Sequence, residues 1–319
     1  MPFESYLMIF AISLGVTLVA YPVLIPFLHK LKYGQTVSEY MPSQAKKTGT
    51  PTMGGIIFIA IPIIIQCILH PTSIQNPSVI LVMLAFIGYG IIGFIDDYII
   101  VVTKNNAGLS PRNKFLAQLF LAVVFYILFQ SSISTAISIP LTSISIELGP
   151  LYVLFVLLMF ASCSNAVNLT DGMDGLAGGT SILALTPFVL FAIHDGEYEL
   201  ACFIIAIIAS LVGYLRYNFF PAKIFMGDCG ALALGGVLAA LGLVLKRELI
   251  VILIGLVFVV ETASVILQVF WVKKFGHRIF KCSPIHYHFE QSGMKEKNVV
   301  FMFYGIGALC AVLGYFIGL

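Results

Sequence analysis

The residues most suited to chemistry in this sequence are carboxylates at the ends of long apolar runs. Asp96 and Asp97 stand together in GFIDDY, and Asp228 stands in FMGDCG. Carboxylates in or beside membrane segments are costly and usually serve a function. Adjacent helical positions point about 100° apart, so we expect Asp96 and Asp97 to have different partners: one a metal ion or substrate, the other a lysine. A simple cap of the following helix is the alternative for Asp228.

A second polar stretch, NLTDGMDGL, begins at Asn168. If the preceding helix continues through it, Asn168, Asp171 and Asp174 share one face. They would then offer amide and carboxylate oxygens to a sugar, a base or hydrated Mg²⁺. A turn built from Asn, Asp and Gly is the alternative.

Two further motifs suit a phosphorylated ligand. Lys47 and Thr52 belong to KTGTPTMGG, which can hold phosphate through ammonium, hydroxyl and backbone N–H groups. His286 and His288 in PIHYHFE fit phosphate contacts or proton transfer better than zinc, because no third ligand stands at a suitable spacing. Asn218, among the cations that precede Asp228, also favours an anionic ligand.

The elements that must position these residues are membrane helices. Of the 319 residues 60% are hydrophobic and 10% charged, and the mean hydropathy is +1.02, which excludes a soluble globule. The net charge of +2 gives no indication of a nucleic-acid partner. We therefore predict an all-α, polytopic membrane protein with one domain, 1–319, and ten spans. The expected spans are 3–28, 53–70, 78–101, 115–133, 151–168, 177–193, 200–217, 230–245, 249–272 and 299–318.

The cations predict the orientation of these spans. The alternate loops 29–52, 102–114, 169–176, 216–229 and 273–298 hold 15 of the 17 Lys and Arg residues. By the positive-inside rule these loops face the cytoplasm and both termini lie outside. All five polar motifs also fall in these loops. We expect one site for a multiply anionic ligand with Mg²⁺, next to the lipid.

The motifs resemble those of one family, the phospho-N-acetylmuramoyl-pentapeptide-transferases (MraY), in the polyprenyl-phosphate N-acetylhexosamine-1-phosphate transferase superfamily. The matching segments are TPTMGG at 50–55, GFIDDY at 93–98, NLTDGMDGLA at 168–177, FMGDCGAL at 225–232 and PIHYHFE at 284–290. The resemblance implies a Mg²⁺-dependent, multi-pass enzyme of the bacterial inner membrane with a cytoplasmic active site. Such an enzyme joins UDP-MurNAc-pentapeptide to undecaprenyl phosphate, giving lipid I and UMP. A homodimer and sensitivity to nucleoside antibiotics are implied as well.

The resemblance also implies residue roles. Asp228 matches the Mg²⁺ ligand, and Asp96 and Asp97 match paired acids near the pyrophosphate and the lipid phosphate. Which of the two acts on the lipid phosphate, and whether it attacks covalently, stays open. His286 is expected to be catalytic. The other expected site residues bind substrate: Lys47, Thr52, Lys114, Asn168, Asp171, Asp174, Asn218, Phe225 and His288, with Phe225 a candidate to stack on uracil.

Three questions stay open at the level of sequence. The family usually has histidine where Tyr287 stands, and tyrosine cannot carry a positive charge there. Glu261 and Gln268, within the ninth expected span, are either buried hydrogen-bonding residues or the lining of a lipid groove. The alternative activities are a UDP-GlcNAc:polyprenyl-phosphate GlcNAc-1-phosphate transferase and an ion-coupled transporter. A transporter usually has inverted repeats and charges near the midplane, and neither is visible here.

Overall fold

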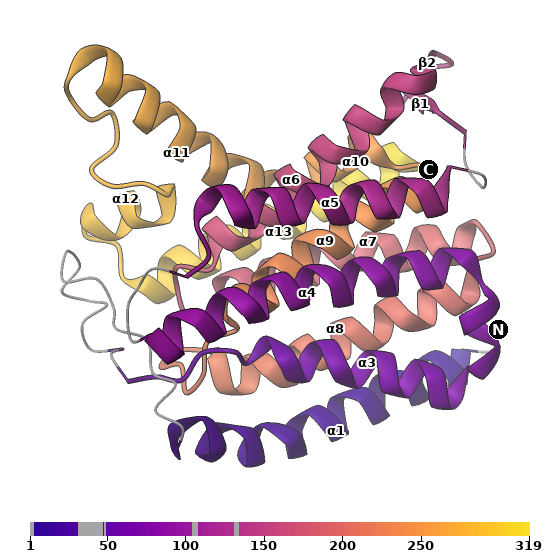
Figure 1. Cartoon of the computed structure of the whole chain (residues 1–319), viewed down its shortest axis with the longest axis horizontal. Helices are drawn as coiled ribbons and strands as arrows, with labels where there is room; N and C mark the ends of the chain where they lie inside the picture. The colour runs from indigo at the N-terminus through magenta and orange to yellow at the C-terminus, as the bar shows by residue number, and fades with distance from the viewer. Residues whose placement is uncertain (1–2, 31–46, 48, 104–107, 131–133) are drawn as a thin grey trace.

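The computed structural model describes residues 3–30, 47, 49–103, 108–130 and 134–319, and they form a bundle of helices (Figure 1). The helices are α1 (Phe3–Lys30), α3 (Gly55–Leu69), η1 (Pro71–Gln75), α4 (Pro77–Thr103), α5 (Pro111–Phe129), η2 (Gly149–Leu151), α6 (Tyr152–Thr170), α7 (Leu176–His194), α8 (Tyr198–Asn218), α9 (Gly227–Val244), α10 (Glu248–Ile254), α11 (Leu256–Phe275), α12 (Ile285–Gln291) and α13 (Glu296–Gly318). The strands β1 (Ala136–Ser138) and β2 (Ser145–Glu147) form an antiparallel hairpin. The all-α membrane architecture is confirmed.

Nine helices of the described part are long and apolar enough to cross a membrane, and α3, with 15 residues, is a shorter apolar helix. Together they account for the ten expected spans. The single helix expected over 249–272 is wrong, because the chain breaks at Gly255 into α10 and α11. Gly255 has apolar residues on both sides, so the hydropathy stays high through this position and does not reveal the break.

Helix α9 lies at the centre of the bundle, packed against α4 and α6. Its sequence, GDCGALALGGVLAALGLV, consists mainly of small residues, which allow helix backbones to approach closely. A Cβ on Gly235 would lie 2.4 Å from Cα of Ser164 on α6. On α4, a Cβ on Gly93 would lie 2.1 Å from the backbone oxygen of Asp228. Close packing therefore sets Asp228 directly against α4 and α6.

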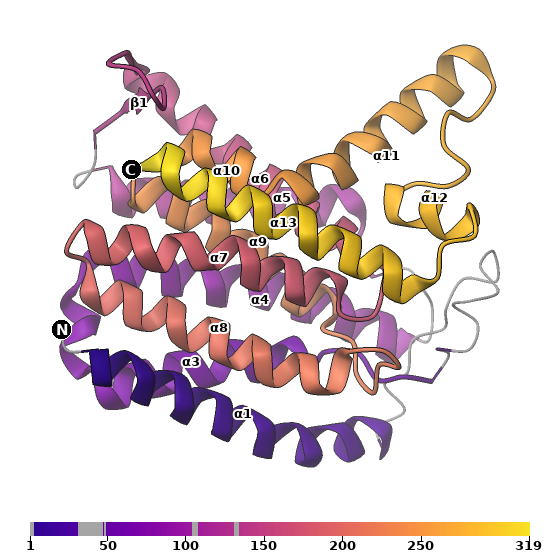
Figure 2. The ribbon, with the colours of Figure 1, turned by 180° about the vertical axis from the view of Figure 1, so that it is seen from behind.

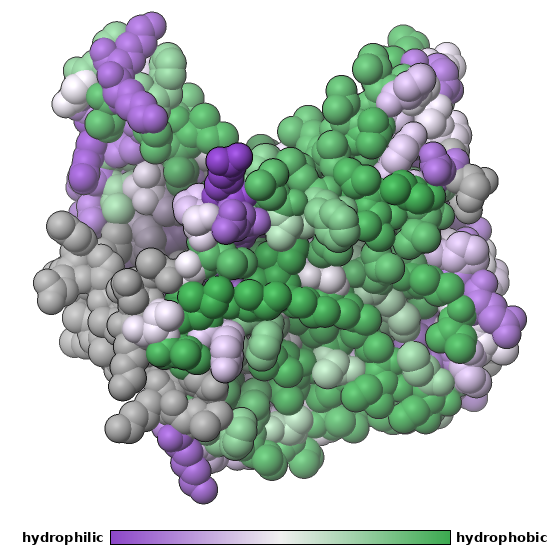
Figure 3. Space-filling view, viewed as in Figure 1, coloured by the Kyte–Doolittle hydropathy of each residue, from purple (hydrophilic) through white to green (hydrophobic). Residues whose placement is uncertain are grey.

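The two ends of the bundle differ. Helix α1 begins and α13 ends at the same end, where the β1–β2 hairpin also lies (Figures 1 and 2). The end of α4, the start of α5, and α12 lie at the other end. In the space-filling view apolar side chains cover the middle of the molecule, and a notch separates the projecting end of α11 from the hairpin end (Figure 3). Parts of the expected loops 29–52 and 102–114 lie outside the described residues.

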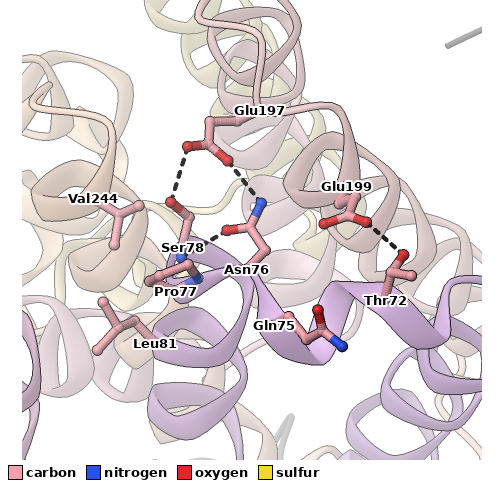
Figure 4. Close-up of a pocket in the computed structure, with 9 residues that line it drawn as sticks. All are labelled: Thr72, Gln75, Asn76, Pro77, Ser78, Leu81, Glu197, Glu199 and Val244. Atoms are coloured by element: carbon pink, nitrogen blue, oxygen red, sulfur yellow. Dashed lines mark hydrogen bonds between the residues drawn. The ribbon is translucent and has the colours of Figure 1, made fainter. Parts of the chain in front are cut away.

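A polar cavity of about 570 Å³ lies between the η1–α4 junction and the start of α8 (Figure 4). Its carboxylates already have partners. Glu197 accepts from Asn76 Nδ2 and Ser78 Oγ, each at 3.1 Å, and Glu199 accepts from Thr72 Oγ1 at 2.9 Å. These hydrogen bonds tie α8 to the start of α4. The cavity is accordingly part of a structural junction, and none of the residues expected to do chemistry lines it.

Candidate active site

Three of the expected carboxylates meet at the end of the bundle where α4 finishes and α9 begins. Asp96 and Asp97 are buried on the last turns of α4, and Asp228 lies in the first turn of α9. Lys114 of α5 contacts two of them: Nζ is 3.3 Å from Asp96 Oδ2 and hydrogen-bonds Asp228 Oδ2. Asn168 Nδ2 of α6 donates to Asp228 Oδ1 at 2.7 Å. We call these five residues the carboxylate cluster.

Asp96 and Asp97 have different partners, as the helical geometry predicts. Asp96 accepts from the backbone N–H of Leu109 at 2.6 Å and contacts Lys114. Asp97 accepts from the backbone N–H groups of Asp228 at 3.2 Å and Cys229 at 3.0 Å. Asp97 thus satisfies free N–H groups at the start of α9, a role that the sequence had suggested as an alternative for Asp228. The carboxylate of Asp228 does not cap its own helix and instead contacts Lys114 and Asn168 within the site.

The segment Thr50–Gly55 lies against the segment that precedes α9. Phe225 N–H donates to the Pro51 carbonyl, and Gly54 N–H donates to the Phe225 carbonyl, both at 2.8 Å. Thr52 is buried, and its Oγ1 has no hydrogen-bond partner among the described residues. A Cβ on Gly227, where φ is +70°, would lie 2.5 Å from Thr52 Oγ1 and 2.3 Å from Asp97 Oδ2. Glycine at 227 therefore lets Thr52 reach the edge of the carboxylate cluster.

A second group of charges lies beside the carboxylate cluster. Lys47 Nζ is 2.6 Å from Asp174 Oδ1 and 2.6 Å from Glu296 Oε1, at the start of α13. Glu296 also accepts from the backbone N–H of Asp174 at 3.0 Å. Burial lowers the pKa of Lys47, but its hydrogen bonds and ion pairs with the two acids prevail and raise it above the ordinary value. Lys47, Asp174 and Glu296 line a cavity of about 690 Å³ together with Lys295.

The stretch after α6 is a turn and not a continued helix. Helix α6 ends at Thr170, and Gly175 has a φ of +82°. The expected shared face of Asn168, Asp171 and Asp174 is therefore wrong: Asn168 contacts Asp228, whereas Asp174 contacts Lys47. Glycine at 175 permits the positive φ of this turn, which a continued helix would exclude.

Asp171 follows the last residue of α6. Burial, and to a lesser extent the charges of Asp228 and Asp174, raise its pKa to about 7 against the opposing charge of Lys47. A carboxylate with this pKa exchanges a proton near neutral pH. Asp171 is thereby electrostatically linked to both the carboxylate cluster and the Lys47 group.

Asn218 and Phe225, two of the residues expected to bind substrate, do not contact the carboxylate cluster through any described hydrogen bond. Asn218 is buried at the end of α8: Oδ1 accepts from Gly175 N–H and Nδ2 donates to the Ile224 carbonyl, both at 2.9 Å. Both polar atoms of Asn218 thus shape the neighbouring turns. The ring of Phe225 is half-buried, and the backbone of Phe225 pairs with Pro51 and Gly54.

The two histidines of PIHYHFE face different surroundings. His286 is fully buried, and its Nδ1 lies 3.0 Å from Oε2 of Glu261 on α11. Tyr287 OH donates to the Gly172 carbonyl at 3.0 Å, so this position does supply a hydrogen bond. His288 Nδ1 accepts from the Lys281 backbone N–H at 3.2 Å. The described contacts bring His286 to the turn after α6 and leave His288 outside the site.

The donor set suits a divalent cation. Among the described residues no three His, Cys, Asp or Glu side chains stand together as a ready metal cage. Mg²⁺, however, is commonly held by one or two carboxylates together with substrate phosphates and water. The cluster holds three carboxylates and one lysine, which contacts Asp96 and Asp228, so two negative charges remain if all are ionised. Thr52 Oγ1, which has no partner within the described part of the chain, adds a further oxygen nearby. The residues present fit such an ion.

Two partners were not expected from the sequence. Glu296 stands immediately before an apolar run, where an acid also occurs as an ordinary residue of a helix's first turn. Its contact with Lys47 spans 249 positions in the chain, a distance that no local pattern reveals. Glu261 had no assigned partner before the structure. A carboxylate inside an apolar span was the only signal available for it.

Known proteins resemble this chain over almost its whole length. A family model described as glycosyl transferase family 4 matches residues 79–246. A phospho-N-acetylmuramoyl-pentapeptide-transferase of Staphylococcus aureus (strain bovine RF122 / ET3-1) is 47% identical over 312 residues, which cover 96% of this chain and 97% of that protein. Proteins of the same name from strains MSSA476 and MW2 show the same identity and coverage.

Proposed function

Because the chain belongs to the phospho-N-acetylmuramoyl-pentapeptide-transferase family, we propose that the carboxylate cluster is the catalytic centre for its transfer reaction. The enzyme transfers phospho-MurNAc-pentapeptide from UDP-MurNAc-pentapeptide to a polyprenyl phosphate, undecaprenyl phosphate, giving lipid I and UMP. The observation that carries the proposal for the site is the meeting of Asp96, Asp97 and Asp228 at one end of the bundle, where Lys114 contacts Asp96 and Asp228.

The chemistry exchanges one phosphoanhydride for another. An oxygen of the lipid phosphate attacks the phosphorus that carries the sugar, a new P–O–P bond forms, and UMP leaves with the old bridging oxygen. The second pKa of a phosphate monoester is near ~6, so the lipid phosphate is mostly a dianion at neutral pH. No strong general base is required. This favours direct attack over an enzyme-bound intermediate on Asp96 or Asp97.

Crowded negative charge is the main barrier that the protein must lower. Mg²⁺ bound at Asp228 would neutralise the diphosphate and help to align it. Lys114 holds Asp96 and Asp228 in place and adds a positive charge at the same point. Lys47 adds a second ammonium group, which Asp174 and Glu296 orient at the neighbouring cavity. Positioning and charge are the two effects that these residues supply.

The lipid substrate has an apolar surface available in the bilayer. A cavity of about 360 Å³ between α6 and α11 is lined almost entirely by apolar side chains, among them Phe155, Leu158, Phe258 and Ile266. Helix α11 projects from the bundle beside it (Figures 1 and 2). Such a surface suits a polyprenyl chain because burying apolar area is favourable for it.

The proposed setting is the bacterial inner membrane, with the catalytic centre on the cytoplasmic side. Its support is the distribution of cations: Lys273 and Lys274 lie in the last turn of α11, and Arg278 lies in the basic loop that follows it. We also propose a homodimer, as the family resemblance implies. Cross-linking of the purified enzyme in detergent would detect a dimer, and protease access in sealed vesicles would identify the side on which α12 lies.

A UMP-release assay tests the proposed function. The purified enzyme in detergent receives undecaprenyl phosphate and Mg²⁺ together with either UDP-MurNAc-pentapeptide or UDP-GlcNAc. We expect UMP with the first nucleotide sugar and almost none with the second. Release from UDP-GlcNAc alone would assign the related GlcNAc-1-phosphate transfer instead. UMP release that needs no lipid phosphate would contradict both transferase assignments.

A further inference from the structure

We propose that Glu261 is a positioning residue for His286: it fixes the orientation of the imidazole ring and influences transfer only through that ring. The inference rests on the proposed function, because it takes His286 to serve the transfer reaction. It also answers a question that the sequence left open, the purpose of an acid inside an apolar helix.

The contact between Glu261 and His286 is specific and buried from solvent. Glu261 lies on α11, and His286 lies in the first turn of α12. Oε2 of Glu261 is 3.0 Å from Nδ1 of His286 and 3.5 Å from its backbone N. Both side chains are 0% exposed. Among the described residues the carboxylate of Glu261 makes hydrogen bonds to His286 only. Removing the carboxylate of Glu261 would therefore first change the orientation of the His286 ring.

The contact also decides which ring nitrogen carries the proton. An ionised carboxylate can only accept hydrogen bonds, so Nδ1 of His286 is the donor. In the neutral ring Nε2 is then left with its lone pair, and in the charged ring it is a second donor. Carboxylates that fix a histidine in this way are common partners of working histidines, where they set ring orientation and tautomer.

The opposite side of the ring points to the turn after α6. A Cβ on Gly172 would lie 2.3 Å from Nε2 of His286, so only glycine at 172 allows the ring this position. Nε2 is buried and makes no hydrogen bond with the described residues. Gly172 follows Asp171, the residue whose charge is linked to Asp228. Glu261 thus directs Nε2 toward the part of the site that adjoins the carboxylate cluster.

The rival explanation is that Glu261 merely anchors α12 to α11. The two explanations predict different results when the ring is absent. An anchor would still matter to the fold and the activity after His286 is replaced, whereas a positioning residue would have nothing left to position. A comparison of Glu261 variants in the presence and absence of the ring therefore separates them.

The experiment measures kcat and KM for UMP release by the full-length enzyme carrying Glu261→Leu, Glu261→Gln, His286→Asn, or Glu261→Leu with His286→Asn. We expect Glu261→Leu to lower kcat about 10- to 100-fold, with less change in KM. Glu261→Gln keeps an acceptor oxygen and should retain more of the activity. In the His286→Asn background, adding Glu261→Leu should change kcat less than about twofold, because the effect passes through the ring.

Glu248 provides the matched control. It is also a buried glutamate, but it lies at the opposite end of the bundle and is held by Tyr152 and Lys246. Glu248→Leu should lower the melting temperature without the kcat pattern described for Glu261. An equal loss of kcat from Glu261→Leu in both His286 backgrounds would overturn the proposal, as would wild-type kcat in Glu261→Leu.

An NMR measurement that needs no enzyme activity distinguishes failure of the positioning role from failure of the proposed function. In protein labelled with ¹⁵N-histidine, the signal absent from His286→Asn identifies His286. We expect it to report a protonated Nδ1 in the wild type and to shift in Glu261→Leu. An unchanged signal would refute the positioning role even if the enzyme is active. A wild-type enzyme that releases no UMP would instead refute the proposed function, with the ¹⁵N result still deciding the contact.

Discussion

Asp228 is the residue on which the proposed chemistry depends most. Both of its carboxylate oxygens already have partners, Asn168 on one side and Lys114 on the other, and both partners are remote from Asp228 in the sequence. Such support keeps a carboxylate in one orientation, which a shared site for a cation and a diphosphate requires.

Replacing Asp228 with asparagine tests this role. The variant keeps the shape of the side chain but loses the charge, and we expect UMP release to fall by at least ~100-fold, with a higher Mg²⁺ requirement. Asp195→Asn is the control, because Asp195 is exposed at the opposite end of the bundle. Near-normal turnover of Asp228→Asn with unchanged Mg²⁺ dependence would refute the assignment.

The raised pKa of Asp171 predicts how the stability of the protein depends on pH. Its pKa in the folded protein is about 7, raised mainly by burial, against about 3.9 in an unfolded chain. The unfolded state therefore releases this proton at lower pH than the folded state, and the contribution of Asp171 to stability falls as the pH rises from about 4 to about 7. Asp171→Asn should raise the melting temperature more at pH 8 than at pH 5. An equal change at both pH values would contradict this.

At the residue scale, the sequence predicted the participants better than their partners. The divergence of Asp96 and Asp97 follows from helix geometry alone, and it is found. That Asp97, and not Asp228, would satisfy the start of α9 could not be foreseen, because it depends on how closely α4 and α9 pack. Glu296 was missed for the same reason: its partner Lys47 is remote in the sequence.

Among the elements, the small residues of α9 bring the site together. A Cβ on Gly235 would meet Cα and backbone atoms of the Cys163–Ser164 segment within about 2.7 Å, and backbone cannot move aside as a side chain can. We expect Gly235→Ala to destabilise the protein by about 1–3 kcal/mol through overpacking, seen as a lower melting temperature in detergent.

Gly305 on α13 is the matched control, because a Cβ there would meet no atom within 4 Å. Alanine favours helix by about 1 kcal/mol over glycine, so Gly305→Ala should leave the melting temperature unchanged or raise it. If Gly235→Ala were as stable as Gly305→Ala, close approach of α9 to α6 would not be what holds the site.

Element boundaries were predicted less well than element types. Hydropathy identifies which segments lie in lipid, but it does not report the direction of a helix axis, so the break at Gly255 was hidden. The turn over 171–175 was one of two predicted alternatives, and its glycines decided between them. The β1–β2 hairpin was not expected, because each strand has only three residues.

At the scale of the whole molecule, one arrangement accounts for most of the observations. Apolar helices form the body, and polar motifs from separate connections meet at a single end, while an apolar cavity lies between α6 and α11. Charge distribution and hydropathy predict this much because they are properties of the whole chain. They cannot predict which side chains touch, since those contacts depend on packing between distant helices.

The dependence of UMP release on a divalent cation tests the central claim most directly. The purified enzyme is treated with EDTA, supplied with UDP-MurNAc-pentapeptide and undecaprenyl phosphate, and then titrated with Mg²⁺. The account predicts no UMP after EDTA and full recovery on addition of Mg²⁺, with either substrate alone giving none. Undiminished UMP release in EDTA would contradict the claim that the carboxylate cluster binds a divalent cation required for the transfer.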